Sequence, residues 1–250
     1  GATRVAPEEG GKKGLTRMSS ALVTIENLNK SYGRGPVLQS LNLTVNSGRI
    51  VGVMGPNGCG KTTLFKILTG LISDYQGTVT IDGQAPGVYT KSIVSYLPEK
   101  TYLSDWMRAK DALDMFRDFY ADFDRQKAAE MLQRFRLDEK MKLKSMSKGM
   151  QEKLQLILVM SRAAKLYILD EPLSGIDPAA RDYILNTILR NYSENASVVL
   201  STHLIGDIER ALDEVLMLKD NTVFLHQGVD ELREAHGCSV DEYFREVFRA

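Results

Sequence analysis

This sequence has few cysteines, no long apolar run and no formal net charge. Cys59 and Cys238 are the only cysteines, too few for a disulfide framework, and this low usage fits a reducing compartment such as the cytoplasm. No uninterrupted apolar segment approaches the roughly 20 residues that a membrane-spanning helix needs. Basic and acidic residues each total 32, so no net field would draw the chain onto nucleic acid, and no nucleic-acid partner is expected.

The composition that remains is that of a globular protein. Of the 250 residues, 43% are hydrophobic and 26% are charged, which is enough to bury the core of one large or two small domains. Residues 1–17 are rich in Gly, Lys and Arg and lack the apolar centre of a secretion signal. We expect this stretch to be a disordered leader or a remnant of recombinant expression, and a basic interaction tail is the alternative.

The next part of the chain alternates short β-type runs with turn signals. Runs at 22–28, 37–45 and 49–54 predict a small antiparallel layer that leads into a buried strand. Residues 62–71 then show helical spacing, so the predicted order is strand, glycine-rich loop and helix. The apolar face of this helix consists of Leu64, Ile67, Leu68 and Leu71.

Helical patterns dominate the middle of the chain. After further predicted strands at 77–83 and 93–97, helical periodicity runs from about Ser104 to Met160. We interpret this region as a helical subdomain at about 100–160, inserted between sheet strands. Aromatic and methionine side chains at 102–120 fit core packing or a docking surface for a partner helix. The apolar faces are marked by Trp106, Leu113, Phe116, Phe119, Met131, Leu132 and Phe135.

Strands and helices alternate again towards the end of the sequence. Apolar runs at 166–170 and 196–202 flank a helix predicted at 179–190, as in the βαβ units of a parallel sheet. Residues 240–249 have an amphipathic helical pattern that is expected to pack against the domain. The sequence therefore predicts an α/β fold with a mostly parallel sheet.

The glycine-rich segment from Gly55 to Thr62 matches the phosphate-loop pattern G-x-x-x-x-G-K-T. Its glycines leave backbone N–H groups free to surround phosphate oxygens, and the start of the following helix adds a favourable dipole. Lys61 would reach the β- and γ-phosphates, and Thr62 would supply a hydroxyl ligand to Mg²⁺. Thr63 would either contact phosphate or cap the helix. The segment predicts that the chain binds Mg²⁺ and ATP.

Two adjacent carboxylates follow the predicted strand at 166–170. Asp170 and Glu171 would stand at the C-terminal edge of a parallel sheet, where ligands bind. Asp170 can hold the water shell of Mg²⁺, and Glu171 can polarise the attacking water as a general base. Such a pair on its own is more often a solvated turn, but its combination with the phosphate loop favours an active site.

These motifs, in this order, make the chain from Met18 onwards resemble the ATP-binding domains of the ABC family. The resemblance implies an ABC ATP-binding domain at 18–250, with a P-loop NTPase core, an N-terminal antiparallel β subdomain and an inserted α-helical subdomain. It also implies a switch histidine at His203 and an adenine-stacking aromatic at Tyr32, for which plain packing is the alternative. The D-loop of the family is similar to Ser174, Gly175 and Asp177.

Two motifs depart from the common pattern of that family. The signature is similar to Met146-Ser-Lys-Gly-Met150, in which Ser147 and Gly149 retain a hydroxyl and a bare backbone at a helix start. Lys148 would be either a phosphate contact or a solvated residue. Glu99 replaces the usual Q-loop glutamine, and its carboxylate can still be an oxygen ligand for Mg²⁺. Both departures resemble bacterial exporter-type ATPases, including subunits of peptide antibiotic export and resistance systems.

The resemblance implies an ATP-hydrolysing subunit that powers transport, with export expected, through separate transmembrane permease subunits. Each ATP would lie between two nucleotide-binding subunits, in a homodimer or a heterodimer at the inner face of the cell membrane. The expected catalytic residues are Lys61, Glu171 and His203, and the metal ligands are Thr62, Glu99 and Asp170. The expected ATP-binding residues are Tyr32, Gly55, Pro56, Asn57, Gly58, Cys59, Gly60, Lys61, Thr62 and Thr63, with Ser147, Lys148 and Gly149 from the opposite subunit.

Two other functions fit parts of this pattern. A soluble ABC ATPase acting on ribosomes or DNA would usually carry two cassettes or a long coiled-coil insertion, and neither is present. A regulatory module that binds nucleotide without turnover is disfavoured because Glu171 and His203 are retained. The transported substrate is not encoded in such a subunit, since it would contact the membrane partner.

Overall fold

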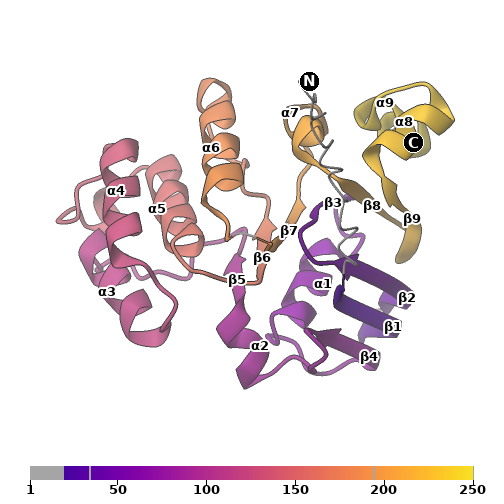
Figure 1. Cartoon of the computed structure of the whole chain (residues 1–250), viewed down its shortest axis with the longest axis horizontal. Coiled ribbons are helices and arrows are strands. Elements are labelled where there is room, and N and C mark those ends of the chain that lie inside the picture. The colour runs from indigo at the N-terminus through magenta and orange to yellow at the C-terminus, as the bar shows by residue number, and fades with distance from the viewer. Residues whose placement is uncertain (1–19, 34, 194, 250) are drawn as a thin grey trace, which may run out of the picture.

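A computed structural model describes residues 20–33, 35–193 and 195–249. The leader predicted at 1–17 lies outside these described residues. Figure 1 shows an antiparallel sheet beside a larger, mostly parallel sheet, and most of the helices lie along the larger sheet. The predicted α/β fold class is therefore confirmed. Among the described residues, no helix combines the length and apolar character needed to cross a bilayer.

The antiparallel sheet contains the first strands of the chain. Its strand order is β2-β1-β4, with β1 at Ala21–Tyr32, β2 at Gly35–Asn46 and β4 at Gln76–Ile81. Strand β1 pairs antiparallel with both neighbours. Its alternating side chains place Val23 and Ile25 in the core, as expected for a sheet with one buried face. The predicted antiparallel layer is present.

The larger sheet has the strand order β5-β6-β7-β3-β8-β9. Neighbouring strands from β5 to β8 are parallel, and β9 pairs antiparallel with β8. Because parallel strands share their direction, the carboxyl ends of β3, β6 and β7 meet at one edge. The strands span Ile50–Met54 (β3), Val94–Leu97 (β5), Leu166–Asp170 (β6), Ser197–Ser201 (β7), Glu214–Lys219 (β8) and Thr222–Gly228 (β9).

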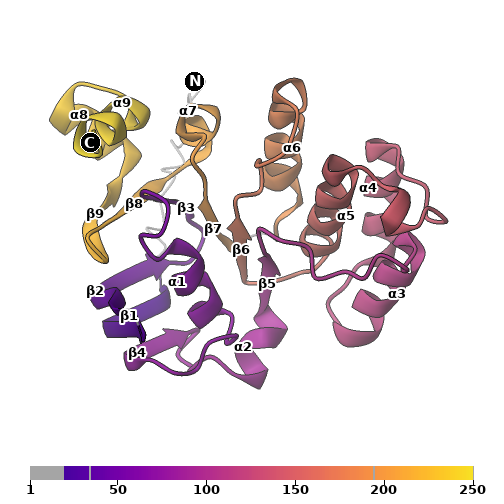
Figure 2. The same cartoon turned by 180° about the vertical axis from the view of Figure 1, so that it is seen from behind.

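Helices cover both faces of this sheet, which is why its strands are apolar on both sides. In β6, Leu166 and Ile168 pack with helix α1 and the antiparallel sheet, whereas Tyr167 and Leu169 pack with the other helices. Helices α3, α4 and α5 gather at the end of the molecule away from the antiparallel sheet (Figures 1 and 2). The helices are α1 (Lys61–Leu68), α2 (Val88–Ile93), α3 (Ala109–Phe119), α4 (Arg125–Phe135), α5 (Lys148–Met160), α6 (Pro178–Asn191), α7 (Ile205–Ile208), α8 (Val229–His236) and α9 (Val240–Val247).

Several predicted details are wrong. Leu71 was expected on the apolar face of the helix at 62–71, but α1 ends at Leu68 and Leu71 is exposed. The helix stops there because Gly70 has φ 70°, a left-handed conformation that closes helix ends. Trp106 precedes α3 and Phe119 is its last residue, and both are exposed, so neither marks a buried face. Strands β8 and β9 and helices α2, α7 and α8 were not predicted.

Candidate functional site

The glycine-rich loop joins the end of β3 to the start of α1. Gly60 caps the helix with φ 104° and, as a glycine, has no side chain that could hydrogen-bond to the first turn. A Cβ atom at Gly60 would lie 2.6 Å from Cδ2 of Leu38 and 2.9 Å from the carbonyl oxygen of Val37. Only glycine fits this conformation and this contact, so the N–H groups at the start of α1 remain open to an anion.

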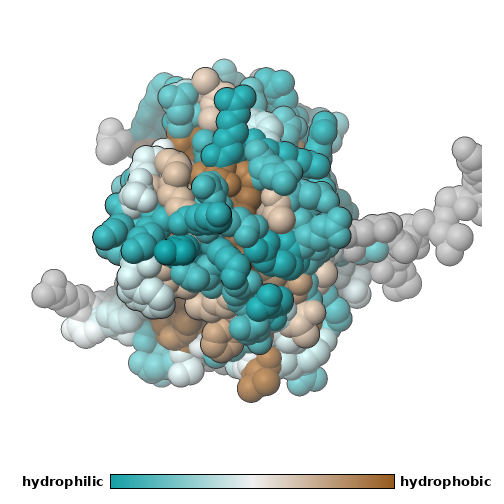
Figure 3. Space-filling model, turned by 90° about the vertical axis from the view of Figure 1, so that its left-hand side faces the viewer, coloured by the Kyte–Doolittle hydropathy of each residue, from teal (hydrophilic) through white to brown (hydrophobic). Residues whose placement is uncertain are grey.

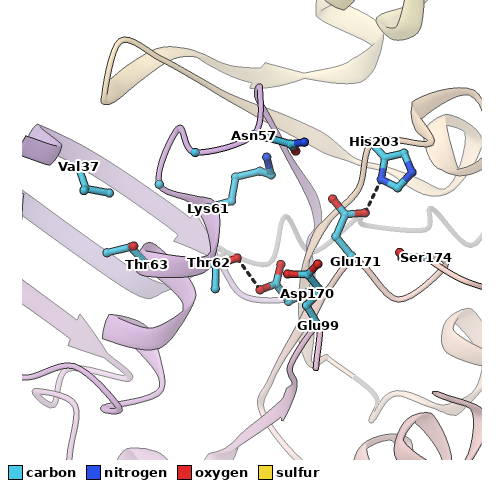
Figure 4. Close-up of a pocket in the computed structure, with 12 residues that line it drawn as sticks. Val37, Asn57, Lys61, Thr62, Thr63, Glu99, Asp170, Glu171, Ser174 and His203 are labelled. Atoms are coloured by element: carbon cyan, nitrogen blue, oxygen red, sulfur yellow. Dashed lines mark hydrogen bonds and ion pairs between the residues drawn. The ribbon is translucent and has the colours of Figure 1, made fainter. Parts of the chain in front are cut away.

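Lys61 folds back over the loop that precedes it. Its Nζ donates to the carbonyl oxygen of Gly55 at 2.8 Å and to that of Pro56 at 3.2 Å. Figure 4 shows its ammonium end pointing towards Asn57. Cys59 is buried beneath the loop, and a Cβ atom at Gly55 would lie 2.5 Å from its Sγ. Cys59 is therefore a packing residue of the loop.

Asp170 is held from two sides at the end of β6. The hydroxyl of Thr62 donates to Oδ2 at 2.8 Å, and the hydroxyl of Ser201 donates to Oδ1 at 2.6 Å. Asp170 is only 2% exposed, so these donors replace the water that an ionised carboxylate would otherwise bind. Ser201 is opposite Asp170 in the register of β6 and β7 and also accepts a hydrogen bond from the backbone N–H of Glu171 at 3.0 Å.

Glu171 and His203 face each other directly after β6 and β7. Nδ1 of His203 lies 2.8 Å from Oε2 of Glu171. Because an ionised carboxylate can only accept, the imidazole is the donor. Glu171 has φ 52°, an uncommon left-handed conformation for a residue other than glycine. This turn directs its side chain into the pocket (Figure 4), where it can accept a proton from a bound water.

These side chains line one pocket of about 420 Å³. Glu99, which follows β5, joins Asp170 and Glu171 on one side, and Lys61 lies on the other (Figure 4). Burial, together with the negative charges of Asp170 and Glu99, raises the pKa of the neighbouring Tyr96 well above its ordinary value. The lining consists of Val37, Asn57, Gly58, Gly60, Lys61, Thr62, Thr63, Glu99, Asp170, Glu171, Ser174 and His203.

The oxygen atoms in this pocket fit Mg²⁺ that is shared with a phosphate ligand. Mg²⁺ prefers hydroxyl, carboxylate, phosphate and water oxygens. Thr62 and Asp170 present such atoms side by side, and Glu99 lines the same pocket. In the described part of the chain, no cluster of three or more His, Cys, Asp and Glu side chains could hold an ion alone. The protein ligands would thus need phosphate and water oxygens beside them.

Other predicted site residues lie outside this pocket. Tyr32 stands at the turn between β1 and β2 and is 46% exposed. Asp177 caps α6, since its Oδ1 accepts from the N–H of Ala179 at 2.9 Å. Gly175 has φ 78°, and a Cβ atom there would lie 2.5 Å from Oε1 of Glu152. Of these D-loop residues, only Ser174 reaches the pocket.

The signature residues stand at the start of α5, away from the pocket lining. Ser147 caps the helix, and its Oγ accepts from the N–H of Met150 at 3.3 Å. Lys148 is the first helical residue, and its largely exposed Nζ lies 3.7 Å from Oε1 of Glu152. Gly149 lies against the carbonyl oxygen of Gly175, at 3.8 Å from its Cβ position. The pocket of one chain is therefore built without the signature.

Two residues of the site were missed by sequence reasoning. Ser201 bonds to both Asp170 and Glu171, and Val37 lines the pocket from β2. A signal for Ser201 was available, because it ends the apolar strand two positions before His203 and would lie beside the end of β6 in a parallel sheet. No comparable signal marks Val37.

Comparisons with known proteins agree with this architecture. A family model described as ABC transporter matches residues 38–174. The ABC transporter ATP-binding protein YtrB of Bacillus subtilis is 30% identical over 220 residues, covering 86% of this chain and 75% of that protein. The lantibiotic transport ATP-binding protein SrtF of Streptococcus pyogenes is 27% identical over 211 residues, covering 84% of this chain and 92% of SrtF.

A solved structure of the ATP-binding subunit of an ABC transporter has the same fold. It superposes with a TM-score of 0.82 at 28% identity, and the match covers 90% of this chain and 99% of that one. The resemblance stated from the sequence is thereby confirmed. Because the family model spans the phosphate loop, the carboxylate pair and the region between them, this chain belongs to the ABC transporter family as an ATP-binding protein and an ATPase.

Proposed function

We propose that this ATPase powers export across the cell membrane by hydrolysing Mg²⁺-bound ATP and passing the motion to separate transmembrane subunits. The observation that carries the catalytic part is the convergence of Lys61, Thr62, Asp170, Glu171 and His203 in one pocket. The names of the relatives favour a transporter over a soluble ABC ATPase acting on ribosomes or DNA.

Phosphate binding would use the open start of α1 and the ammonium of Lys61. The carbonyl oxygens of Gly55 and Pro56 now accept from Lys61, and phosphate oxygens can replace them with little movement of the side chain. Asn57, Gly58 and Thr63 line the same pocket. Since α1 has no side-chain cap, its first N–H groups would bind the β- and γ-phosphates.

Thr62, Asp170 and Glu99 would hold Mg²⁺ at the same place. The hydroxyl of Thr62 already contacts the carboxylate of Asp170, so both oxygens face one point. When bound, Mg²⁺ neutralises negative charge on the phosphate oxygens. The role of Ser201 is to keep Asp170 in place, because its hydroxyl donates to the carboxylate oxygen that Thr62 does not contact.

Water activation would fall to Glu171. Its backbone is fixed by Ser201, and its side chain is oriented by His203, so the carboxylate has a defined direction. A carboxylate in this position accepts a proton from the attacking water as the water approaches the γ-phosphate. Lys61 stabilises the charge on the phosphoryl group that is transferred.

A second copy would complete each site. Ser147, Lys148 and Gly149 do not line the pocket of their own chain, although Ser147 and Gly149 have the hydroxyl and bare backbone that suit a phosphate. A head-to-tail pair would bring the signature of one copy to the ATP of the other. The partner would be an identical or a related nucleotide-binding subunit.

The transmembrane subunits would dock beside Glu99. A groove of about 450 Å³ begins next to Pro98, and Leu71 and Tyr102 on its lining are 63% and 50% exposed. Figure 3, which looks onto the end of the molecule formed by α3 and α4, shows partly exposed apolar side chains among hydrophilic ones. Docking there would put this chain at the inner face of the membrane, with helices α3 to α5 as the insert that transmits motion.

Export is the direction favoured by the relatives and by the two unusual motifs. SrtF is named for lantibiotic transport, and Glu99 and the signature of this chain resemble those of exporter-type ATPases. The pocket would bind nucleotide, and the transported molecule would instead contact the transmembrane subunits.

Replacing Glu171 by Gln tests the catalytic proposal. The amide keeps the shape of the side chain but cannot accept a proton from water, so ATP hydrolysis should fall by at least about 100-fold while ATP binding persists. Glu234→Gln is the matched control, because Glu234 is an exposed carboxylate on α8 and should leave the rate unchanged. Equal hydrolysis rates for wild type and Glu171→Gln would refute the role of Glu171.

A further inference from the structure

Lys30 is a buried lysine in β1, next to the turn that carries Tyr32. Its side chain is only 5% exposed, whereas lysine side chains usually keep their ammonium in water. Its Nζ donates to Oδ2 of Asp74 at 2.9 Å. The side chain of Asp74 is 97% exposed, so water screens this ion pair and the pair alone does not account for the burial of the lysine.

The second contact of Lys30 is the ring of Tyr32. The ammonium lies over the ring, 4.7 Å from its centroid. A cation within about 6 Å of an aromatic face is attracted by the negative charge of that face. Tyr32 as a residue is still 46% exposed, so Lys30 contacts the ring without enclosing it.

The strand that follows the turn of Tyr32 lies against the phosphate loop. Tyr32 pairs with Gly35 and Lys30 pairs with Leu38 in the register of β1 and β2. Leu38 and Val37 are the residues that a Cβ atom at Gly60 would touch, and Val37 lines the pocket. A nucleotide whose phosphates lie on the loop would therefore have its base on the side of this turn.

We propose that Lys30 is a positioning residue for the base of the nucleotide. Its ammonium holds the ring of Tyr32 in one orientation and draws electron density towards the covered face, so that the other face stacks more strongly on a purine. The inference rests on the proposed binding of ATP and on the role that the family resemblance implies for Tyr32, whose ring would stack on adenine, and it adds a residue and a mechanism to that role. Lys30 contacts the ring and has no contact with the base itself.

A structural role for the lysine gives a different expectation. If Lys30 only ties β1 to Asp74, its removal should weaken the fold and reduce binding of every phosphate compound. If it acts through Tyr32, its removal should reduce binding only of ligands that carry a base. Inorganic triphosphate is the probe that separates the two roles, because it occupies the phosphate loop and has no base to stack.

The test is equilibrium binding of ATP and of inorganic triphosphate to five proteins, namely wild type, Lys30→Met, Lys30→Arg, Tyr32→Ala and the double variant of Lys30→Met with Tyr32→Ala. Lys30→Met keeps an unbranched apolar side chain as long as the aliphatic part of lysine and removes the charge, and we expect it to weaken ATP binding about 3- to 10-fold. Binding of inorganic triphosphate should not change. In the Tyr32→Ala background, Lys30→Met should have no further effect. With Tyr32 present, Lys30→Arg keeps the positive charge and should retain most of the wild-type ATP affinity.

Other outcomes would overturn the inference. If Lys30→Met weakens ATP and triphosphate binding equally, the role of the lysine is structural and does not involve the base. If Lys30→Met weakens ATP binding by the same factor with and without the Tyr32 ring, the lysine does not act through the ring. If Tyr32→Ala binds ATP with wild-type affinity, the ring does not contribute to ATP binding, and Lys30 has no base to position through it. The catalytic proposal is tested separately, by the hydrolysis rate of Glu171→Gln.

Discussion

Helices α1 and α5 both begin at motifs that are predicted to contact phosphate, but their first turns are built differently. The cap of α1 is Gly60, with φ 104° and no side chain bonded to the first turn. The cap of α5 is Ser147, with an extended backbone and a side chain that accepts from Met150. One helix start is left open, and the other is closed by its own sequence.

This difference determines what each helix can offer to a ligand. The open N–H groups of α1 make an anion site within a single chain. Ser147 uses only an acceptor lone pair for its cap, so its hydroxyl hydrogen remains free to donate to a phosphate oxygen. Helix α5 can therefore contribute one donor to the nucleotide of another chain without losing its own cap. The first site is preformed, and the second is available only after assembly.

The largest expected effect is that of Gly60→Ala, compared with Gly149→Ala as its matched control. At Gly60 the added methyl group meets Leu38 and Val37 in a left-handed conformation, so stability should fall by about 1–3 kcal/mol and ATP affinity about tenfold or more. At Gly149 the added methyl group would lie 3.8 Å from the carbonyl oxygen of Gly175, and this residue does not line the pocket of its own chain, so stability and ATP binding to the separate chain should change little. Thermal unfolding and titration calorimetry measure them. Equal loss of ATP binding in both variants would abolish the distinction between the two helix starts.

Ser147→Ala should have an intermediate effect, and Asp124→Ala controls for capping alone. Asp124 caps α4 by accepting from the N–H of Lys127 at 2.9 Å, much as Ser147 caps α5. Each variant should lose about 1 kcal/mol of stability with its cap. Only Ser147→Ala should also lose ATP hydrolysis, by about tenfold or more, because it removes a donor to phosphate.

Urea unfolding and hydrolysis rates at several protein concentrations provide the measurements for this pair. The loss in Ser147→Ala should be accompanied by normal binding of ATP to the separate chain, since its own pocket lacks Ser147. Parallel losses of hydrolysis in Ser147→Ala and Asp124→Ala would mean that both act through stability, and the role of Ser147 towards a second copy would be wrong.

Much of the fold and the open site could be predicted because their signals are local in the sequence. The loop from Gly55 to Thr62 lies between a strand and a helix that its own residues specify. Asp170 and Glu171 directly follow the apolar strand that holds them at the sheet edge. The closed start of α5 was recognised through family resemblance, because Met146 to Met150 departs from the usual signature.

The missed features depend on contacts between distant segments. Ser201 acquires its role from its register with Asp170, which is 31 positions away. Lys30 hydrogen-bonds to Asp74, which is 44 positions further along the chain. Helical periodicity identified the buried Leu113 and Phe116, but it could not show that Phe119, at the end of the same helix, is left uncovered. Periodicity specifies a face, and tertiary packing decides how far along the helix it is buried.

The smallest expected effect concerns Glu152, a carboxylate near the start of α5 that has no counterpart in α1. Glu152 lies just beyond the first turn of α5 and packs against Gly175, whereas α1 contains no acidic residue. Burial raises the pKa of the Glu152 carboxyl, and Lys148 opposes the shift only partly. The folded chain therefore binds this proton more tightly than the unfolded chain. The stabilisation from protonation is present at low pH and is lost as the pH rises through the folded pKa.

Glu152→Gln should remove this loss of stability at high pH, because glutamine carries no charge at any pH. At about pH 8 the variant should unfold at a slightly higher temperature than wild type, and below about pH 4 the difference should disappear because the glutamate is then protonated in both states. Thermal unfolding across this pH range is the measurement, and the exposed Glu234→Gln should show no such trend. A lower unfolding temperature for Glu152→Gln at pH 8 would mean that the ion pair with Lys148, at 3.7 Å, outweighs the cost of burial. In that case the charge of Glu152 would help to close the start of α5.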